Sequence, residues 1–480
     1  MTVNRLTNMN GSLKKTPPKR LLIYFVILMI ILAAIGFLAI PRGGEKTKKE
    51  EIKEEVPLIL EWGEVYAFNE EGYEPSIASD SYGVLYYTAH KNVDRGYQDR
   101  LNTWGNQFAS WFFYSVDNGQ TWSVPSEPDP YGEIWKYALG DEGDIGVDSR
   151  DYVYYVDTTL RDINIHVYAN QGDWQYSNVF RKASEELDDR PWIAAQGNGI
   201  VHYLGNNAVT FPGHQGRYIY YRSTNGAMTF TIQQDIPGNG WLHIDTERYG
   251  DHAYIVKETT TGIDADIVIH ITDDQGVSWN WNDPVYIGHR DGPGGPPGEG
   301  SRWPVVAAGE NGTVWVLWGD YEDAADNGSK LFLGRSQDYG QTWNVSEITP
   351  FQGVHDYFWV SAGPNGSVGV SFYSTEDLPV DDNSEWYIYG GMTINTDGVD
   401  MDEIEINITR ADPNPCYVGT DYHALHDFHE NCISPDGAFN IAYQYYVGPG
   451  NGDSDLYYVR GELPKEAPGE EEEEEEDKGD

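Results

Sequence analysis

The sequence predicts an all-β protein: a seven-bladed β-propeller preceded by one N-terminal transmembrane helix. A pattern of apolar strand, glycine-containing tight turn and alternating aromatic strand occurs seven times, and a third strand follows each copy. The eight-residue stretch SVDNGQTW, residues 115–122, also recurs as TDDQGVSW and SQDYGQTW. Two-residue alternation split by turn residues is typical of hairpins, and units of about four strands at such spacing are typical of propellers.

The seven hairpins give the order of the predicted blades. They begin at Glu74, Gly143, Arg190, Trp241, Arg302, Asp356 and Asp427. The last unit shows only three strands before the acidic tail. We therefore expect residues 57–68, which form a lone strand ahead of the first unit, to pair with the last unit and close the ring.

The N-terminal region predicts a membrane anchor. Residues 21–40 are uncharged and almost wholly apolar, and a helix of that length spans roughly 30 Å, the thickness of a bilayer core. A cleaved signal peptide is the alternative, but its apolar region is shorter, about 7–15 residues. The predicted domains are a cytoplasmic N-terminus, the anchor, a charged stalk, the propeller and a disordered acidic tail, at residues 1–20, 21–40, 41–56, 57–463 and 464–480.

Charge and cysteine content favour an exterior location. The net charge is −46, which excludes nucleic acid as a partner because phosphate binding requires Lys and Arg. The two cysteines, Cys416 and Cys432, predict one disulfide outside the cell. Sequons predict a glycoprotein; they occur at Asn311, Asn327, Asn344, Asn365 and Asn407. We expect a single-pass protein of the cell membrane with its propeller on the extracellular side.

The recurring eight-residue stretch predicts a structural turn. Its Ser and Asp side chains can accept or donate hydrogen bonds within the turn, its glycine can take positive φ, and its Trp can pack between sheets. The stretch resembles the Asp-box, or bacterial neuraminidase repeat, of sialidase-like propellers, and the chain resembles an uncharacterised membrane-anchored member of that superfamily. The residues that carry the resemblance are Ser115, Asp117, Gly119, Trp122, Asp274, Gly276, Trp279, Ser336, Asp338, Gly340 and Trp343.

The resemblance implies a possible sialidase-like glycosidase. Sialidases bind a substrate carboxylate with three arginines and use an Asp acid/base and a Tyr nucleophile paired with Glu. Here SRWPVV at residues 301–306 supplies Arg302, but in the fifth blade rather than the first, and DRPWIA offers Arg190 one position out of register. The arginine triad is not recognisable, so whether the protein is an enzyme stays open.

Aligning the hairpins on their turn glycines predicts a site where the inner strands begin, at one mouth of the channel. Carboxylates accept from sugar hydroxyls, and aromatic rings stack on sugar faces. The candidate catalytic residues are Asp356, Asp427 and Arg302. The candidate ligand-binding residues are Asp141, Asp189, Arg190, Trp303, His355, Tyr357 and His426. The alternative is that these side chains are solvated or bonded to backbone at the channel lip.

No cofactor is required by any motif, and one acidic loop could bind calcium. Asn451, Asp453 and Asp455 place oxygen ligands at alternate positions, without the glycine and distal Glu of an EF-hand loop. The leading functional hypothesis is a surface module that binds a cell-surface glycan or protein. A sialidase-like glycoside hydrolase is the alternative, and a structural component of the cell envelope is the second alternative.

Overall fold

The computed structural model describes thirteen stretches of the chain. They are residues 58–91, 110–125, 143–158, 162–181, 189–206, 218–238, 242–260, 264–291, 304–320, 328–381, 383–417, 428–445 and 454–464. The chain divides into two compact units, Met1–Val56 and Pro57–Asp480, and every described residue belongs to the second. The predicted anchor, stalk and acidic run lie outside the described residues. Within the thirteen stretches, no helix has the length and apolar character needed to cross a bilayer.

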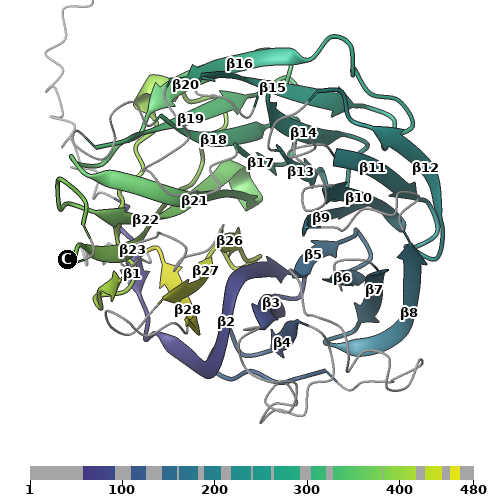
Figure 1. Ribbon diagram of the computed structural model, residues 1–480, viewed down its shortest axis with the longest axis horizontal. Helices are drawn as coiled ribbons and strands as arrows, with labels where there is room; N and C mark the ends of the chain where they lie inside the picture. Colours follow the sequence, from purple (N-terminus) through teal and green to yellow (C-terminus); the bar gives the residue numbers. More distant parts are fainter. Residues whose placement is uncertain are drawn as a thin grey trace, which may run out of the picture. The chain divides into compact units, whose positions relative to one another are not determined.

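The second unit is an all-β propeller, as predicted, with sheets set radially around an axis (Figure 1). Its inner strands neighbour one another in sequence order around that axis, and the last of them contacts the first. In order they are β2 (Tyr66–Ser79), β5 (Gly143–Val147), β9 (Asp189–Gln196), β13 (Leu242–Thr246), β17 (Val305–Ala308), β21 (Val354–Gly363) and β26 (Glu430–Ile433).

The strands outside this inner ring complete antiparallel sheets. The second sheet along the chain adds β6 (Val153–Thr158), β7 (Asp162–Ala169) and β8 (Asp173–Arg181). The next adds β10 (Ile200–Asn206), β11 (Tyr218–Ser223) and β12 (Phe230–Asp235). Two further sheets add β14 (Ala253–Glu258), β15 (Ala265–Thr272) and β16 (Val285–Arg290), then β18 (Val314–Asp320), β19 (Lys330–Ser336) and β20 (Asn344–Glu347). A five-stranded sheet adds β22 (Ser367–Thr375), β23 (Glu385–Thr393), β24 (Thr409–Arg410) and β25 (Cys416–Tyr417). Two 3-10 turns lie at Pro364–Gly366 and Met401–Glu403.

The prediction of seven separate blades is wrong. In the described part of the chain, the hydrogen bonds define five separate sheets and one seven-stranded sheet. The large sheet joins β26, β27 (Phe439–Tyr445), β28 (Asp455–Glu462), β2, β3 (Leu85–Lys91) and β4 (Trp111–Ser115), with β1 (Glu61–Trp62) also on β28. The two sheets predicted as first and last are joined because β2 pairs with both: Tyr66 and Ala67 pair with β28, and residues from Gly72 onward pair with β3.

The predicted closure of the ring by the N-terminal segment is confirmed. Glu61 and Trp62 pair with Glu462 and Gly461, and the first part of β2 continues along β28. The Trp62 indole also donates a hydrogen bond of 2.8 Å to Thr409 Oγ1 of β24. The beginning and end of the propeller are therefore held in one sheet without a covalent link.

Aromatic side chains fill the space between neighbouring sheets. Phe112 of β4 stacks on Tyr155 of β6 with ring centroids 4.2 Å apart, and Trp122 meets Tyr458 of β28 edge-on at 5.1 Å. Alternation in each strand points one set of side chains toward each neighbouring sheet, and β-branched and aromatic residues suit such surfaces. Burial of one large apolar side chain stabilises the fold by about 1.5–3 kcal/mol.

The Asp-box turns are held by a repeated set of hydrogen bonds. Ser115 Oγ donates to Asp117 Oδ1 at 2.8 Å and accepts from Gly119 N at 2.9 Å, while Thr121 donates to Asp117 from its backbone and its hydroxyl. Gly119 takes φ +79°, and a Cβ there would collide with the ring of Tyr458. The same pattern recurs in the turns that begin at Thr272 and Ser336.

The degenerate copy at residues 223–230 keeps this geometry. Asn225 Oδ1 accepts from Ser223 Oγ at 2.9 Å and from Thr229 N at 2.9 Å, as the aspartate does elsewhere. Ala227 occupies the glycine position at φ +64°, in the left-handed region that favours glycine. The turn therefore tolerates both substitutions.

The predicted disulfide is wrong, because both cysteines are free thiols. Cys416 lies on β25, which pairs with β23 of the five-stranded sheet, and its thiol donates to the carbonyl of Trp386 at 3.2 Å. Cys432 lies on β26, at the axis of the ring. Their short spacing in the sequence suggested a disulfide, whereas the two cysteines belong to different sheets.

Candidate ligand-binding site

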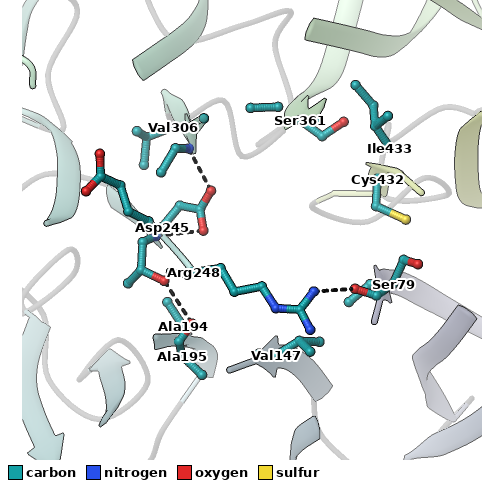
Figure 2. A pocket seen from close by; sticks show the side chains of 18 of the residues that line it. Ser79, Val147, Ala194, Ala195, Asp245, Arg248, Val306, Ser361, Cys432 and Ile433 are labelled. Carbon is teal, nitrogen blue, oxygen red and sulfur yellow. Dashed lines mark hydrogen bonds between the residues drawn. The ribbon is translucent and has the colours of Figure 1, made fainter. Parts of the chain in front are cut away.

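A cavity of about 700 Å³ lies on the axis of the propeller, within the range of ligand pockets. All seven inner strands contribute to its lining, together with the hairpin turns that follow several of them. Figure 2 shows Asp245, Arg248, Ser361 and Cys432 around one open space. The cavity reaches the surface at the turns, where the exposed Tyr249 and Tyr339 form part of its lining.

Small side chains keep the axis open. Ala78 of β2, Gly146 of β5, Ala194 of β9, Ala308 of β17 and Ser361 of β21 all line the cavity. A Cβ at Gly146 would lie 3.2 Å from the backbone nitrogen of Ala195, so a larger residue here would crowd the neighbouring inner strand. The sequence thus leaves room where seven strands converge.

Two carboxyl groups in the cavity share one hydroxyl. Ser76 Oγ lies 2.6 Å from Glu430 Oε2 and 3.2 Å from Asp144 Oδ1. Each carboxyl also accepts a backbone N–H from the next inner strand, Glu430 from Ile77 and Asp144 from Ile193. Burial raises the pKa of Asp144 to about 6 and, with the charge of Asp144 adding to it, raises the pKa of Glu430 well above its ordinary value. The pair therefore favours holding a proton.

Asp245 is a third carboxyl group of the cavity, and it too accepts a backbone N–H from the next inner strand. Asp245 Oδ2 accepts from Ala308 N at 2.8 Å, and its Oδ1 accepts from Thr246 N at 2.7 Å. Burial raises the pKa of Asp245 to about 7, with a further contribution from Asp144. His243, two residues earlier, accepts from Val306 N at Nδ1, and burial lowers its pKa to about 3, so the ring is neutral.

Three polar oxygen atoms of the cavity lining lack a protein partner among the described residues. Glu430 Oε1, Asn431 Oδ1 and Ser361 Oγ make no hydrogen bond within the described part of the chain. Glu430 and Asn431 are only 5% and 3% exposed, and both line the cavity. Buried polar atoms are nearly always satisfied, so these atoms mark where a donor-rich ligand fits.

The rim of the cavity carries aromatic rings and one cation. Tyr339 stacks on His252 with centroids 4.2 Å apart, and its backbone N–H donates to the carbonyl of Gly312. Tyr249 is 62% exposed beside Arg248. Arg248 is bound by its own neighbours: it donates to the carbonyls of Asp148 and Ser79 and pairs with Asp151. Figure 2 shows its side chain reaching toward Ser79.

This arrangement suits a sugar. Carboxyl oxygens accept from hydroxyl groups, and exposed tyrosines can stack on the apolar face of a pyranose ring. Among the described residues that line the cavity, Arg248 is the only arginine. The three-arginine grip implied by the sialidase resemblance is thus not formed by the described lining.

The structure brings together few of the residues predicted from the sequence. His355 and Asp356 are fully buried in β21: His355 bonds Ser374 Oγ and the carbonyl of Phe351, while Asp356 accepts from Tyr357 N. Tyr357 is buried against Tyr373. These three do not line the cavity. Burial lowers the pKa of His355 to about 4.

The other predicted site residues are placed only in part. Asp189 and Arg190 begin β9, but their side chains are outside what the structure describes. Asp455 begins β28, opposite Glu71 and Tyr445. Outside the described residues lie Asp141, Arg302, Trp303, His426, Asp427, Asn451 and Asp453. Within the described stretches, no group of three or more His, Cys, Asp or Glu side chains is placed to hold a metal ion.

The predicted mouth and the observed cavity opening lie at opposite ends of the inner strands. Sequence alignment selected residues at the start of each strand, whereas the cavity opens at the turn that ends it. A signal for the missed residues was present: Asp144, Asp245 and Glu430 are acidic residues on inner strands whose neighbours carry no charge, GDIGV, LHIDT and ENCI. Buried acids of this kind cluster at functional sites.

Comparison with known proteins agrees with the fold. Residues 113–124 match the model of the BNR/Asp-box repeat, which confirms the predicted Asp-box resemblance. No curated protein matches this chain. The chain is similar to a mutant of the NanB sialidase from Streptococcus pneumoniae, with 12% identity, 84% of this chain and 71% of that chain covered, and a TM-score of 0.38.

Two other solved structures show a comparable similarity. A polysaccharide-lyase ulvan lyase shares 9% identity over 81% of this chain and 94% of that chain, with a TM-score of 0.47. An alpha-L-arabinofuranosidase of Fusarium graminearum shares 11% identity over 56% and 91%, with a TM-score of 0.35. At such values these similarities carry no argument about activity. The repeat and the strand arrangement define a β-propeller with Asp-box repeats.

Proposed function

We propose that this chain is a membrane-anchored extracellular propeller that binds a carbohydrate of the cell surface in its axial cavity. The observation that carries the proposal is the cavity itself, with the buried carboxyl groups of Asp144 and Glu430 and the half-buried one of Asp245 inside, and exposed tyrosines at its opening. The apolar stretch at residues 21–40 and the acidic composition support display outside the cell. A cell-surface protein is the alternative partner.

Tyrosine variants test where the ligand binds. Tyr249→Ala and Tyr339→Ala each remove a ring from the cavity rim, so we expect each to weaken glycan binding by about tenfold, as for loss of an aromatic contact worth 1–2 kcal/mol. The measurement is binding of the full-length protein to a glycan array, followed by calorimetry with the best ligand.

Tyr286→Ala is the matched control. Tyr286 is also an exposed tyrosine, 58% accessible, but it lies on the outer strand β16. We expect its affinity to equal that of the parent. Equal losses in all three variants, or none in any, would refute the cavity rim as the binding site.

One observation favours hydrolysis as a second candidate function. Asp144 and Glu430 share the Ser76 hydroxyl, and their raised pKa values allow one carboxyl to donate a proton while the other stays ionised. Incubation of array-positive glycans with the protein, with product analysis, separates the two functions. Turnover that Glu430→Gln abolishes supports a hydrolase, and binding without turnover supports a receptor. If no glycan binds, a structural role in the cell envelope becomes the remaining hypothesis.

A further inference from the structure

We infer that the saccharide bound in the axial cavity carries a protonated amine. This inference rests on the proposed function and specifies the class of its ligand. An ammonium group supplies a positive charge and up to three hydrogen-bond donors at once. Arg248 is the one lysine or arginine in the described lining of the cavity, and it is already paired with Asp151.

The first argument is the balance of charge in the cavity. Its described acidic residues are Asp144, Asp245, Glu247, Glu310 and Glu430, and its only arginine or lysine is Arg248. Arg248 already pairs with Asp151, and His243 is held neutral by burial. Glu247 bonds His252 at the rim, and burial raises the pKa of the Cys432 thiol. A cationic group entering the cavity therefore meets a negative field.

The second argument is independent of charge and concerns hydrogen bonds. Glu430 Oε1 and Asn431 Oδ1 belong to residues that are 5% and 3% exposed, and neither atom is paired with a donor in the described part of the chain. The Asn431 amide is oriented by its own donors, because Nδ2 donates to the carbonyl of Trp359 and to Ser371 Oγ. Two fixed acceptor oxygens from β26 thus require donors from the ligand.

The third argument concerns the protons that the carboxyl groups hold. Burial without a cationic partner raises the pKa of Asp144 and of Asp245 to about 6 and about 7. A nearby positive charge lowers the pKa of a carboxyl group. An amine therefore binds best when these groups can ionise, and its advantage over a neutral sugar shrinks as they are protonated.

The same features disfavour an acidic sugar. The carboxylate of a sialic or uronic acid would enter a cavity lined by carboxyl groups, where like charges repel and no described cation is unpaired. Rejection of one charge sign in this way is a common source of specificity.

Three oligosaccharide probes test the inference with the full-length protein. They are a glucosamine oligomer, the N-acetylglucosamine oligomer of the same linkage and length, and a galacturonate oligomer. Calorimetry at a pH of about 6.5 should show the glucosamine oligomer bound at least about tenfold more tightly than its acetylated form, the difference expected for one charge-assisted hydrogen bond. At a pH of about 4.5 the ratio should fall toward one.

A matched pair of variants assigns the preference to the cavity. Glu430→Gln keeps the shape of the side chain but cannot ionise, so the preference for the amine should be lost. Glu347→Gln makes the same change on the outer strand β20 and should keep the parental preference. Preference for the amine that Glu430→Gln leaves intact would overturn the assignment.

The outcomes separate this inference from the proposed function. Equal binding of the acetylated oligomer, or tighter binding of galacturonate, would overturn the amine and leave glycan recognition standing. Binding confined to array glycans without an amine would do the same. Failure of every glycan to bind would overturn both.

Discussion

Ser76 has a single proton to donate and two carboxyl groups within its reach. Its Oγ lies closer to Glu430 than to Asp144, at 2.6 Å against 3.2 Å. When Glu430 carries a proton, both carboxyl groups can bond the hydroxyl, because Glu430 then donates to Ser76 and Ser76 donates to Asp144. The raised pKa of Glu430, caused first by burial and then by Asp144, agrees with that arrangement. The backbone bonds of these acids join neighbouring blades, so they have a structural role as well.

Glu430→Gln should stabilise the protein at a pH of about 8 by about 2 kcal/mol and leave stability almost unchanged at a pH of about 4. A raised folded-state pKa gives stability that is complete below the unfolded pKa and is lost as the pH rises through the folded value. Glutamine does not titrate, so the advantage of the variant grows with pH. Urea unfolding at both pH values measures it.

The quantity to compare at each pH is the difference in the free energy of unfolding between Glu430→Gln and the parent protein. Five buried histidines have lowered pKa values, which contribute stability with the opposite pH dependence in both proteins; they are His202, His243, His270, His355 and His429. Their effect cancels in the difference. A variant that is less stable than the parent at a pH of about 8 would contradict the shared-proton interpretation.

The Asp-box turn is the element that most clearly separates architecture from chemistry. In the box at residues 115–122 the polar groups bond one another, and Trp122 donates to the carbonyl of Gly119 while packing on Tyr458. In the box at residues 336–343 the same polar bonds form, and only the ring of Tyr339, outside that hydrogen-bond pattern, lines the axial cavity. The copy with Asn225 and Ala227 shows that the hydrogen-bond pattern, not the carboxylate, is required. A turn of this kind fixes how one strand passes to the next.

Asp117→Ala should lower the free energy of unfolding by about 1–2 kcal/mol and leave glycan binding unchanged. Desolvation raises the pKa of Asp117, but the hydrogen bonds from Thr121 and Ser115 together outweigh it and hold the pKa below its ordinary value. The contribution of the carboxylate is present at neutral pH and is lost as the pH falls through the folded pKa. Thermal unfolding at neutral and acid pH tests this sign.

An exposed aspartate in another Asp-box provides the control for Asp117→Ala. Asp273→Ala changes a residue of the same type, one position before the aspartate of another box, and should have little effect. Loss of glycan binding in Asp117→Ala with stability intact would instead indicate that the turn contacts ligand.

At the scale of the whole molecule, the ring depends on pairing between the two ends of the propeller. β1 and the first part of β2 add to β28, and Trp62 packs over Gly461 and Gly390. Because no disulfide joins the described ends, noncovalent contacts such as these keep the ring closed.

Deletion of residues 57–68 should abolish cooperative unfolding and expose the aromatic core. The physical reason is that β28 loses its partner and the space between the first and last sheets opens. Differential scanning calorimetry and dye binding measure both effects. Removal of residues 469–480, a segment of equal length from the acidic tail, should leave the transition unchanged; an unchanged transition in the first deletion would refute closure by this segment.

Much of the fold could be predicted from the sequence because hairpins are local. Period-two alternation and turn glycines located the inner strands, and the three-stranded last unit located the closing segment. The sequence pattern predicted the pairing of the closing segment with the last unit, but not that this segment runs without a break into the first inner strand, so that β2 joins the two sheets. The disulfide between Cys416 and Cys432 was predicted wrongly because their spacing in the sequence does not show which sheet each cysteine joins.

Less of the candidate site could be predicted. Alignment on the turn glycines predicts the position of a residue along the propeller axis. It does not predict which oxygen atoms lack a hydrogen-bond donor, or which backbone N–H of the next strand a carboxyl group accepts. Glu430 illustrates this, because its burial and its contact with Ser76 arise from strands at opposite ends of the chain. The role of Asp356 and Asp427 therefore stays a prediction, and the three acids that line the cavity, Asp144, Asp245 and Glu430, were missed.

The shared strand β2 has a consequence for biosynthesis. Among the described strands β1 is synthesised first and β28 last. Although the later part of β2 can pair with β3, β1 and the first part of β2 have no partner until residues 455–462 have been made. Contacts between such distant segments slow folding, and an unpaired strand edge invites aggregation. Nascent chains halted before residue 455 should therefore remain protease-sensitive and associated with chaperones.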